Sequence, residues 1–94
     1  MIRSFADRET ALIWSGTQSR RLPSEIQAVA LRKLRMLNQA RRLTDLQVPP
    51  GNRLEALKGN RRGQYSIRIN QRWRICFMWR EGGPENVEIV DYHD

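Results

Sequence analysis

The spacing of apolar residues changes partway along this chain, and this change limits the possible fold more than any other feature. From Ile26 to Leu37, apolar side chains recur every three or four residues, which is typical of one face of a helix. From residue 64 onward, apolar and polar side chains alternate, which is typical of strands with one buried face. Helices followed by a run of strands predict an α+β domain, with two to three helices packed on one face of a small, mainly antiparallel twisted sheet.

Local signals indicate where the expected elements begin and end. Asp7 is expected to cap a helix over residues 10–14 that ends at Gly16. Ser24 and Gln27 have the spacing of a capping box at the start of the long helix. The other expected elements are a first strand at 2–5, a helical turn at 43–46, a break at 48–52 and strands at 54–57, 64–69, 72–80 and 87–92.

Length and cysteine content narrow the class of protein. The 94 residues fit one domain, which we expect to span 1–94. The single cysteine, Cys76, cannot form an internal disulfide. No apolar run approaches the roughly 18 residues that are needed to cross a bilayer. We therefore expect a cytoplasmic protein that has no membrane partner.

The basic residues are mostly arginine rather than lysine, and they are distributed unevenly along the chain. There are 17 of them against 10 acidic residues, and all but two are arginine. A guanidinium binds a phosphate through two parallel hydrogen bonds and stacks on bases, which an ammonium does not. All the basic residues lie within 1–80, while half of the acidic ones lie within 81–94. This distribution indicates a polyanionic partner, although a genome rich in G and C also favours arginine codons.

The strand expected at 72–80 places arginines and tryptophans on opposite faces of the sheet. If the face that carries Trp73 packs on the helices, then Arg68, Arg72 and Arg74 share the outer face. We expect no carboxylate opposite these three positions, so their charges repel one another unless a polyanion lies between them. The alternative is an outer face that is simply solvated.

Few residues in the sequence can carry out catalysis. Cysteine and histidine do not cluster as in metal sites, and no glycine-rich phosphate loop is present, so we expect no metal and no cofactor. Metal-free RNA cleavage requires a base for the 2′-hydroxyl, cations for the phosphate and an acid for the leaving 5′-oxygen. Asp91, Tyr92 and His93 offer such proton-transfer groups, since imidazole titrates near neutral pH. The alternative is that these three residues are only a frayed chain end.

Five short motifs, in this order and spacing, resemble those of one toxin family. They are Met1-Ile-x-Ser-Phe5, Leu57-Lys58-Gly59, Gly63-x-Tyr65-Ser66-Ile67-Arg68, Arg72-Trp73-Arg74-Ile75 and Asp91-Tyr92-His93. Together they resemble the HigB branch of the RelE/ParE toxin superfamily. The resemblance implies a RelE-like fold and a toxin of a type II toxin–antitoxin system that cleaves mRNA in the ribosomal A site. It also implies a HigA-like helix-turn-helix antitoxin, with a toxin that is monomeric alone and part of a heterotetramer with the antitoxin.

The resemblance also implies roles for single residues, with two departures from the family pattern. Arg74 matches a phosphate-binding arginine, and the Asp-Tyr-His segment at 91–93 matches the catalytic carboxylate, aromatic group and imidazole. Glu55 stands where relatives place a histidine before the Leu-Lys-Gly triplet, and Arg72 stands where they place an asparagine. A glutamate can still act as a base and an arginine can bind phosphate. Equally, Glu55 could be a plain strand residue that pairs with Arg68 or Arg53.

The resulting hypothesis is a ribosome-dependent, metal-independent endoribonuclease. Its expected catalytic residues are Asp91, Tyr92, His93, Arg74, Arg72 and Glu55, and its expected RNA-binding residues are Lys58, Arg61, Arg62, Arg68, Arg20 and Arg21. Two alternatives stay open: a ParE-like gyrase poison, which does no chemistry, and a basic RNA-binding module. Deletion of residues 91–94 separates these classes, because only cleavage depends on the proton-transfer groups.

Overall fold

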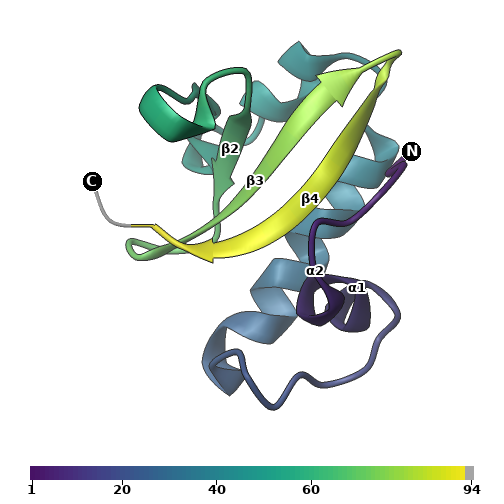
Figure 1. The fold of residues 1–94 in the computed structure, drawn as a ribbon, viewed down its shortest axis with the longest axis vertical. Helices are drawn as coiled ribbons and strands as arrows, with labels where there is room; N and C mark the ends of the chain where they lie inside the picture. The colour runs from purple at the N-terminus through teal and green to yellow at the C-terminus, as the bar shows by residue number, and fades with distance from the viewer. Residues whose placement is uncertain (93–94) are drawn as a thin grey trace.

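The computed structural model describes residues 1–92, in which two helices precede a run of strands (Figure 1). Short 3₁₀ turns, labelled η, join several of these elements. In chain order the elements are α1 (Arg8–Trp14), α2 (Ser24–Gln39), η1 (Leu43–Gln47), η2 (Pro50–Asn52), β1 (Glu55–Ala56), η3 (Gly59–Arg61), β2 (Tyr65–Arg68), β3 (Trp73–Arg80) and β4 (Gly83–Asp91).

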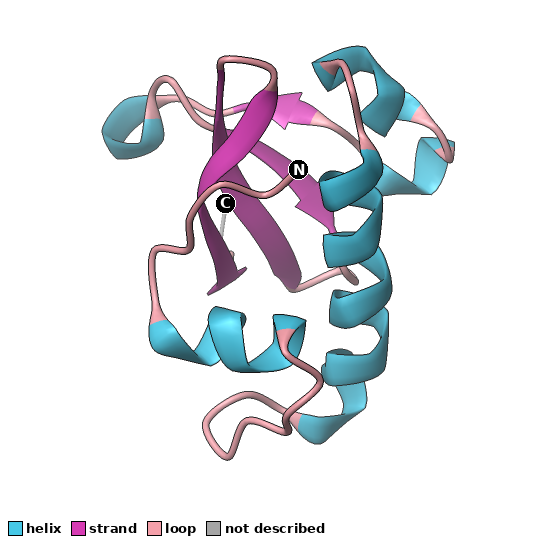
Figure 2. Ribbon diagram, turned by 90° about the vertical axis from the view of Figure 1, so that its right-hand side faces the viewer, coloured by secondary structure: helices cyan, strands magenta, loops and turns pink. Residues whose placement is uncertain are grey.

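The strands of the described chain form one antiparallel sheet in the order β1-β2-β3-β4. The register sets Ile67 of β2 opposite Ile75 of β3, which in turn lies opposite Ile89 of β4. Figure 2 shows α2 running along one side of the sheet, and α1 packs against both α2 and β4. The predicted α+β class, with helices packed on a small antiparallel sheet, is therefore confirmed.

The core lies between α2 and the sheet because both elements present an apolar face to it. Leu34 and Leu37 of α2 and Ile67, Ile75 and Phe77 of the sheet are all fully buried. The sequence period placed these helical residues on one face of α2, and strand alternation placed Ile67 on one face of β2 and Ile75 and Phe77 on one face of β3. The long helix and the central strands are thus confirmed.

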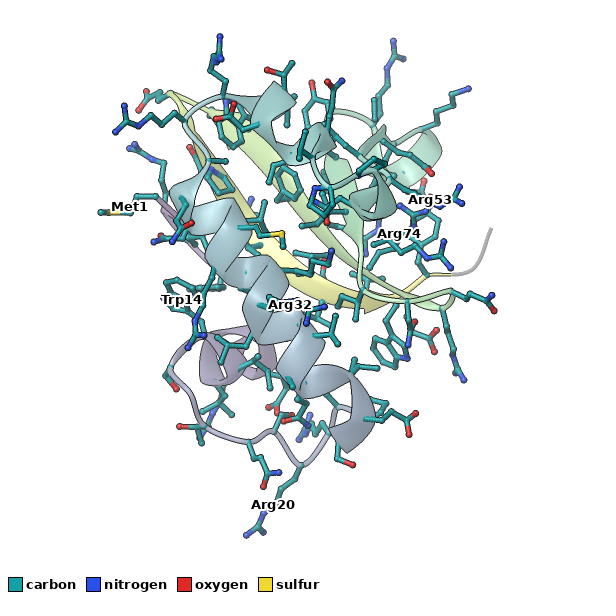
Figure 3. All side chains as sticks on the ribbon, turned by 180° about the vertical axis from the view of Figure 1, so that it is seen from behind. Met1, Trp14, Arg20, Arg32, Arg53 and Arg74 are labelled. Carbon is teal, nitrogen blue, oxygen red and sulfur yellow. The ribbon has the colours of Figure 1, made fainter. Side chains whose placement is uncertain are left out.

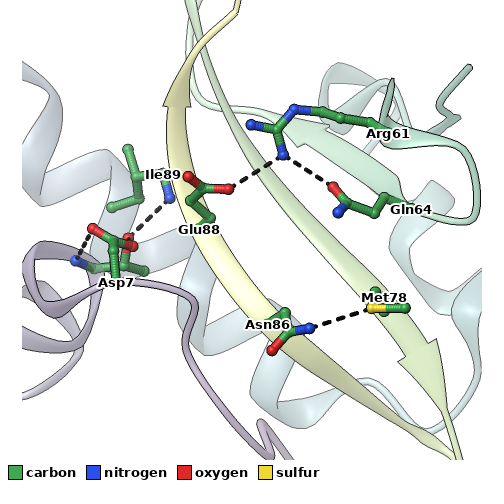
Figure 4. Close-up of polar contacts among 8 residues, drawn as sticks. Asp7, Arg61, Gln64, Met78, Asn86, Glu88 and Ile89 are labelled. Carbon is green, nitrogen blue, oxygen red and sulfur yellow. Dashed lines mark hydrogen bonds and ion pairs between the residues drawn. The ribbon is translucent and has the colours of Figure 1, made fainter. Parts of the chain in front are cut away.

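A polar cap joins the first helix to the last strand. Asp7 accepts hydrogen bonds from the backbone N–H of Thr10 (3.2 Å) and from its hydroxyl (2.6 Å), so the predicted N-cap is confirmed. The fully buried Thr10 hydroxyl oxygen also accepts a hydrogen bond from the N–H of Ile89 in β4 (2.9 Å; Figure 4). The start of α1 is therefore fixed to the edge of the sheet.

The capping box predicted at Ser24 and Gln27 is wrong. Ser24 is already the first helical residue, since Pro23 takes the cap position without a side-chain hydrogen bond. The buried Gln27 amide instead binds the preceding loop: its Nε2 donates to the carbonyls of Ser19 and Leu22 (both 2.8 Å). Its Oε1 accepts from the N–H of Ser19 (3.0 Å). Gln27 therefore orders the connection between α1 and α2.

The strand predicted at 2–5 is reduced to one isolated parallel bridge between Phe5 and Val87. Arg3 also donates its N–H to the carbonyl of Pro84 (2.9 Å), but the N–H of Ile2 donates to Asn38 of α2 (2.9 Å) and the chain turns into α1 at Asp7, so the pairing does not continue as a strand. By contrast, β4 begins at Gly83, earlier than predicted. Glu81 and Gly82 both have positive φ, as in the two-residue hairpin turn that keeps flanking strands paired up to the turn.

None of the helices in the described part of the chain combines the length and the apolar character that crossing a bilayer requires.

Candidate active site

Arg74 lies on the outer face of the sheet, near the start of β3. Strand alternation in β3 directs Arg74 away from the core because its neighbour Ile75 points inward. Its Nη1 donates to Ser66 Oγ (3.0 Å) and to the carbonyl oxygen of Arg53 (3.3 Å), and its Nη2 donates to Glu55 Oε1 (3.1 Å). Only 15% of the side chain is exposed. The guanidinium is therefore held in one orientation by groups from two segments of the chain, residues 53–55 and β2.

Tyr92 covers the same guanidinium from the end of β4. The Cζ atom of Arg74 lies 5.7 Å from the centre of the Tyr92 ring, within the range of a cation–π contact. The backbone N–H of Tyr92 donates to the carbonyl of Arg72 (2.9 Å), which continues the pairing beyond the strand. The structure thus brings together Arg74, Glu55 and Tyr92, three of the residues that the sequence nominated.

Arg72 and Asp91 form a second pair beside this group. Arg72 Nε and Nη2 donate to the two carboxylate oxygens of Asp91 (2.8 and 2.6 Å), a bidentate geometry that is among the stronger ion pairs. These hydrogen bonds raise the pKa of the Arg72 guanidinium above its usual value. Arg72 precedes β3 and Asp91 ends β4, so the pair closes the end of the sheet.

The expectation of an arginine face without opposing carboxylates is wrong. Arg72 pairs with Asp91, and Arg74 pairs with Glu55, so neither depends on a bound polyanion for a partner. The predicted partners of Glu55, Arg68 and Arg53, are also wrong as ion-pair partners. Register explains both results: β1 is antiparallel to β2 and sets Glu55 opposite Ser66, on the same face as Arg74.

A third ion pair covers the middle of the outer face. Arg61, at the end of η3, donates through Nη1 to Gln64 Oε1 (3.0 Å) and to Glu88 Oε1 (3.2 Å; Figure 4). Cys76 lies beneath this layer with 1% of its surface exposed, and burial raises the pKa of its thiol. The outer face is therefore partly covered by the segment around η3.

An open hollow lies between η3 and the end of β4. Lys58, Asn60 and Arg61 line one side of it, and Val90, Asp91 and Tyr92 line the other. It combines an ammonium, a guanidinium, a carboxylate and an aromatic ring within one surface depression. Such a set suits a nucleotide, because cations bind its phosphate and an aromatic ring stacks on its base.

The remaining nominated residues fall into three groups. Arg68 lies opposite Arg74 across β2 and β3, and the exposed Arg62 follows η3, so both border the site. Arg20 and its neighbour Arg21 lie in the loop between α1 and α2, and Figure 3 shows Arg20 at the far end of the molecule from Arg74. His93 lies outside the described residues.

Sequence reasoning missed two groups that hold Arg74 in place. One is the Ser66 hydroxyl, a fully buried polar group between Tyr65 and Ile67 of β2. Its alternation with these two residues is a usable signal. The other is the carbonyl of Arg53, a residue in the left-handed conformation (φ 47°). No side-chain pattern identifies a carbonyl, so the sequence holds no signal for it.

In residues 1–92, no three His, Cys, Asp or Glu side chains lie close enough to hold a metal ion together.

Comparison with solved structures defines the class of protein. The fold resembles that in the YoeB–YefM complex from Staphylococcus aureus, with a TM-score of 0.62 and 16% identity over 100% of this chain and 99% of that chain. The protein therefore has a RelE-like fold.

Comparison of sequences then gives the family. The sequence model of the RelE-like toxin of type II toxin–antitoxin system HigB matches residues 3–94. Toxin HigB-1 of Vibrio cholerae serotype O1 is 40% identical over 90 residues, 95% of each chain. Endoribonuclease HigB of Proteus vulgaris is 28% identical over 97 residues, 99% of this chain and 100% of the relative. The chain belongs to the HigB-like toxin family of type II toxin–antitoxin systems.

Proposed function

We propose that this toxin is an endoribonuclease that cleaves mRNA in the A site of the translating ribosome, using only its own side chains. The observation that carries the proposal is the enclosed position of Arg74 between Ser66, Glu55 and the Tyr92 ring. A cation held in advance stabilises the charge that develops on a phosphate without reorganising during the reaction. The name of the Proteus vulgaris relative, an endoribonuclease, supports the same reaction.

The proposed reaction needs two proton transfers and charge stabilisation. One group removes the proton of the 2′-hydroxyl, whose oxygen attacks the phosphorus, and another protonates the 5′-oxygen as its bond to phosphorus breaks. We assign the proton transfers to Asp91 and His93. Arg74 and Lys58 stabilise the phosphate, and the Tyr92 ring stacks on a base in the hollow that it lines.

Two of the nominated catalytic residues receive positioning roles. Arg72 binds both oxygens of Asp91, so we assign it to orienting that carboxylate. Glu55 binds Nη2 of Arg74, so we assign it to orienting the guanidinium. A role of Glu55 as the general base is the alternative, since 52% of its side chain is exposed.

Contact with ribosomal RNA would come from two separate basic surfaces. Lys58 and Arg61 line the hollow, and Arg62 and Arg68 border the site, so these four are assigned to the RNA around the cleavage site. The pair Arg20 and Arg21 is assigned to a more distant part of the ribosome. Such contacts to phosphates are salt-sensitive and largely independent of sequence.

The proposed partners follow from the family. Membership in a type II toxin–antitoxin family implies an antitoxin, and the fold match lies within a complex of this kind. We assign this chain a HigA-like helix-turn-helix antitoxin, with a toxin that is monomeric alone and a heterotetrameric complex. Cleavage during translation would place its action in the cytoplasm.

Primer extension on translating ribosomes with purified protein tests the proposed reaction. We expect cuts within the A-site codon for the wild type and none for His93→Ala, because the imidazole takes part in proton transfer. Arg80→Ala, at the far end of β3, serves as the matched surface control and should cut like the wild type. Equal patterns for wild type and His93→Ala, or stalled gyrase–DNA complexes without RNA cuts, would contradict the proposal.

A further inference from the structure

Lys33 of α2 is buried, although lysine is among the residues least often found inside proteins. Its Nζ donates a hydrogen bond to Oδ1 of Asn52, a residue with no exposed surface. Within residues 1–92, no carboxylate lies at ion-pair distance from Lys33. Burial, and secondarily the neighbouring Arg32, lowers the pKa of the Lys33 ammonium. A buried ammonium with a neutral partner is costly, so its retention calls for a reason.

Asn52 connects Lys33 to the surrounding turn through further hydrogen bonds. Its side-chain Nδ2 donates to the carbonyls of Leu46 (3.2 Å) and Val48 (3.4 Å), and its backbone N–H donates to the carbonyl of Pro49 (2.9 Å). One side chain therefore fixes the turn from residue 46 to residue 52, and Lys33 fixes that side chain to the long helix.

The segment directly after Asn52 holds Arg74. The carbonyl of Arg53 and the carboxylate of Glu55 are two of the three acceptors for the Arg74 guanidinium, and Figure 3 shows Arg53 beside Arg74. The strand that carries Glu55 pairs with β2 through two residues only. Beyond these two residues, the buried Leu57 donates its N–H to the carbonyl of Gln64 (2.9 Å), so that side of the segment is held by the sheet and by burial. The turn fixed by Asn52 holds the other side.

We infer that Lys33 and Asn52 are positioning residues that set the orientation of the Arg74 guanidinium from the opposite side of the sheet. Neither residue touches the site, so their effect passes through Arg53 and Glu55. The inference rests on the proposed function only where it predicts that Lys33 and Asn52 affect RNA cleavage. The effect on Arg74 itself is measurable without RNA.

The first test follows the Arg74 guanidinium by nitrogen-15 NMR of the free protein. In the wild type we expect a resolved Arg74 side-chain signal with slow guanidinium rotation, because both Nη atoms are bound. Lys33→Met should shift or broaden that signal, and Lys33→Gln, which keeps a neutral donor, should do so less. Arg35→Met, at an exposed position of the same helix, is the matched control and should leave it unchanged.

The second test separates positioning from stability. In single-turnover cleavage on ribosomes, we expect Lys33→Met to lower the rate at saturation on the order of tenfold or more, with unchanged ribosome affinity, because a small misplacement of a catalytic group is costly. If both Lys33 variants keep the wild-type Arg74 signal, even with a lower melting temperature, the inference is overturned. If the wild type cleaves no RNA, the proposed function fails, while the Arg74 signal still decides the inference.

Discussion

The functional side chains of the candidate site are held in place by their hydrogen-bond and ion-pair partners. Arg74 is enclosed by Ser66, Glu55 and Tyr92, and Arg72 is bound at both Asp91 oxygens. The sequence identified all these arginines and acids as candidates, because arginine and carboxylate chemistry can be read from residue type. It could not identify the pairs, because each pair joins residues 19 positions apart in the chain that only the folded sheet brings together, with β2 between the strands of Glu55 and Arg74.

Glu55→Gln distinguishes the proposed role of Glu55, orienting Arg74, from the alternative role as general base. The amide oxygen can still accept from Arg74, so we expect the cleavage rate to fall far less than the roughly 10²–10⁴-fold loss that removal of a general base causes. The pH profile of single-turnover cleavage should also be unchanged. Glu81→Gln, in the β3–β4 turn, controls for the loss of one negative charge. Loss of the acidic limb of the profile would instead identify Glu55 as the base.

For some helices and strands the sequence pattern was enough to predict the element, and for others tertiary contacts determined the structure. The alternation of residues 72–80 and the helical period of 26–37 predicted their elements because burial of one face dominates both. The capping box at Ser24 failed because Gln27 finds three backbone partners in the preceding loop, which satisfy its amide better than a local cap. The strand predicted at 2–5 failed because Ile2 binds Asn38 of α2 and the chain turns into α1 at Asp7, which leaves one bridge to β4.

Thr10→Val tests the joint between α1 and β4. The replacement has nearly the same shape but leaves the N–H of Ile89 without its acceptor and removes a hydrogen bond to Asp7. We expect a loss of about 1–3 kcal/mol in the free energy of unfolding, measured by urea denaturation with circular dichroism. Thr44→Val, at an exposed position in η1, is the matched control. Equal midpoints for the two variants would refute this account of the joint.

Across the described part of the molecule, the arginines of the candidate site differ in their ion pairing from those of the loop between α1 and α2. Arg61, Arg72 and Arg74 each have a carboxylate partner, whereas Arg20 and Arg21 are exposed and make no ion pair within residues 1–92. Net charge, the property that the sequence reports most directly, does not reveal this division. It arises from folding, because only the sheet brings acidic residues of β1 and β4 to the arginines.

Arg20→Ala combined with Arg21→Ala tests the role of the distant basic surface. We expect weaker ribosome binding and a salt-dependence slope that is smaller by on the order of one to two, since up to two phosphate contacts are lost. The cleavage rate at saturation should not change, because Arg20 lies far from Arg74. The pair Arg41→Ala and Arg42→Ala removes the same formal charge and should bind more nearly like the wild type. Equal losses for both double variants would show that net charge alone matters.

The three arginine–carboxylate pairs determine how a phosphate would enter the site. On the proposed function, a phosphate meets guanidiniums whose charge is already offset by Glu55, Asp91 and Glu88, so it binds to the N–H groups that these carboxylates leave free. Because the nearby carboxylates offset the attraction of the cations, we expect RNA that is free in solution to bind here only weakly. A strand that a much larger scaffold already holds in place loses less entropy on binding and can make the same contacts. On the proposed function, selectivity for a translating message is therefore built into the resting ion pairs themselves.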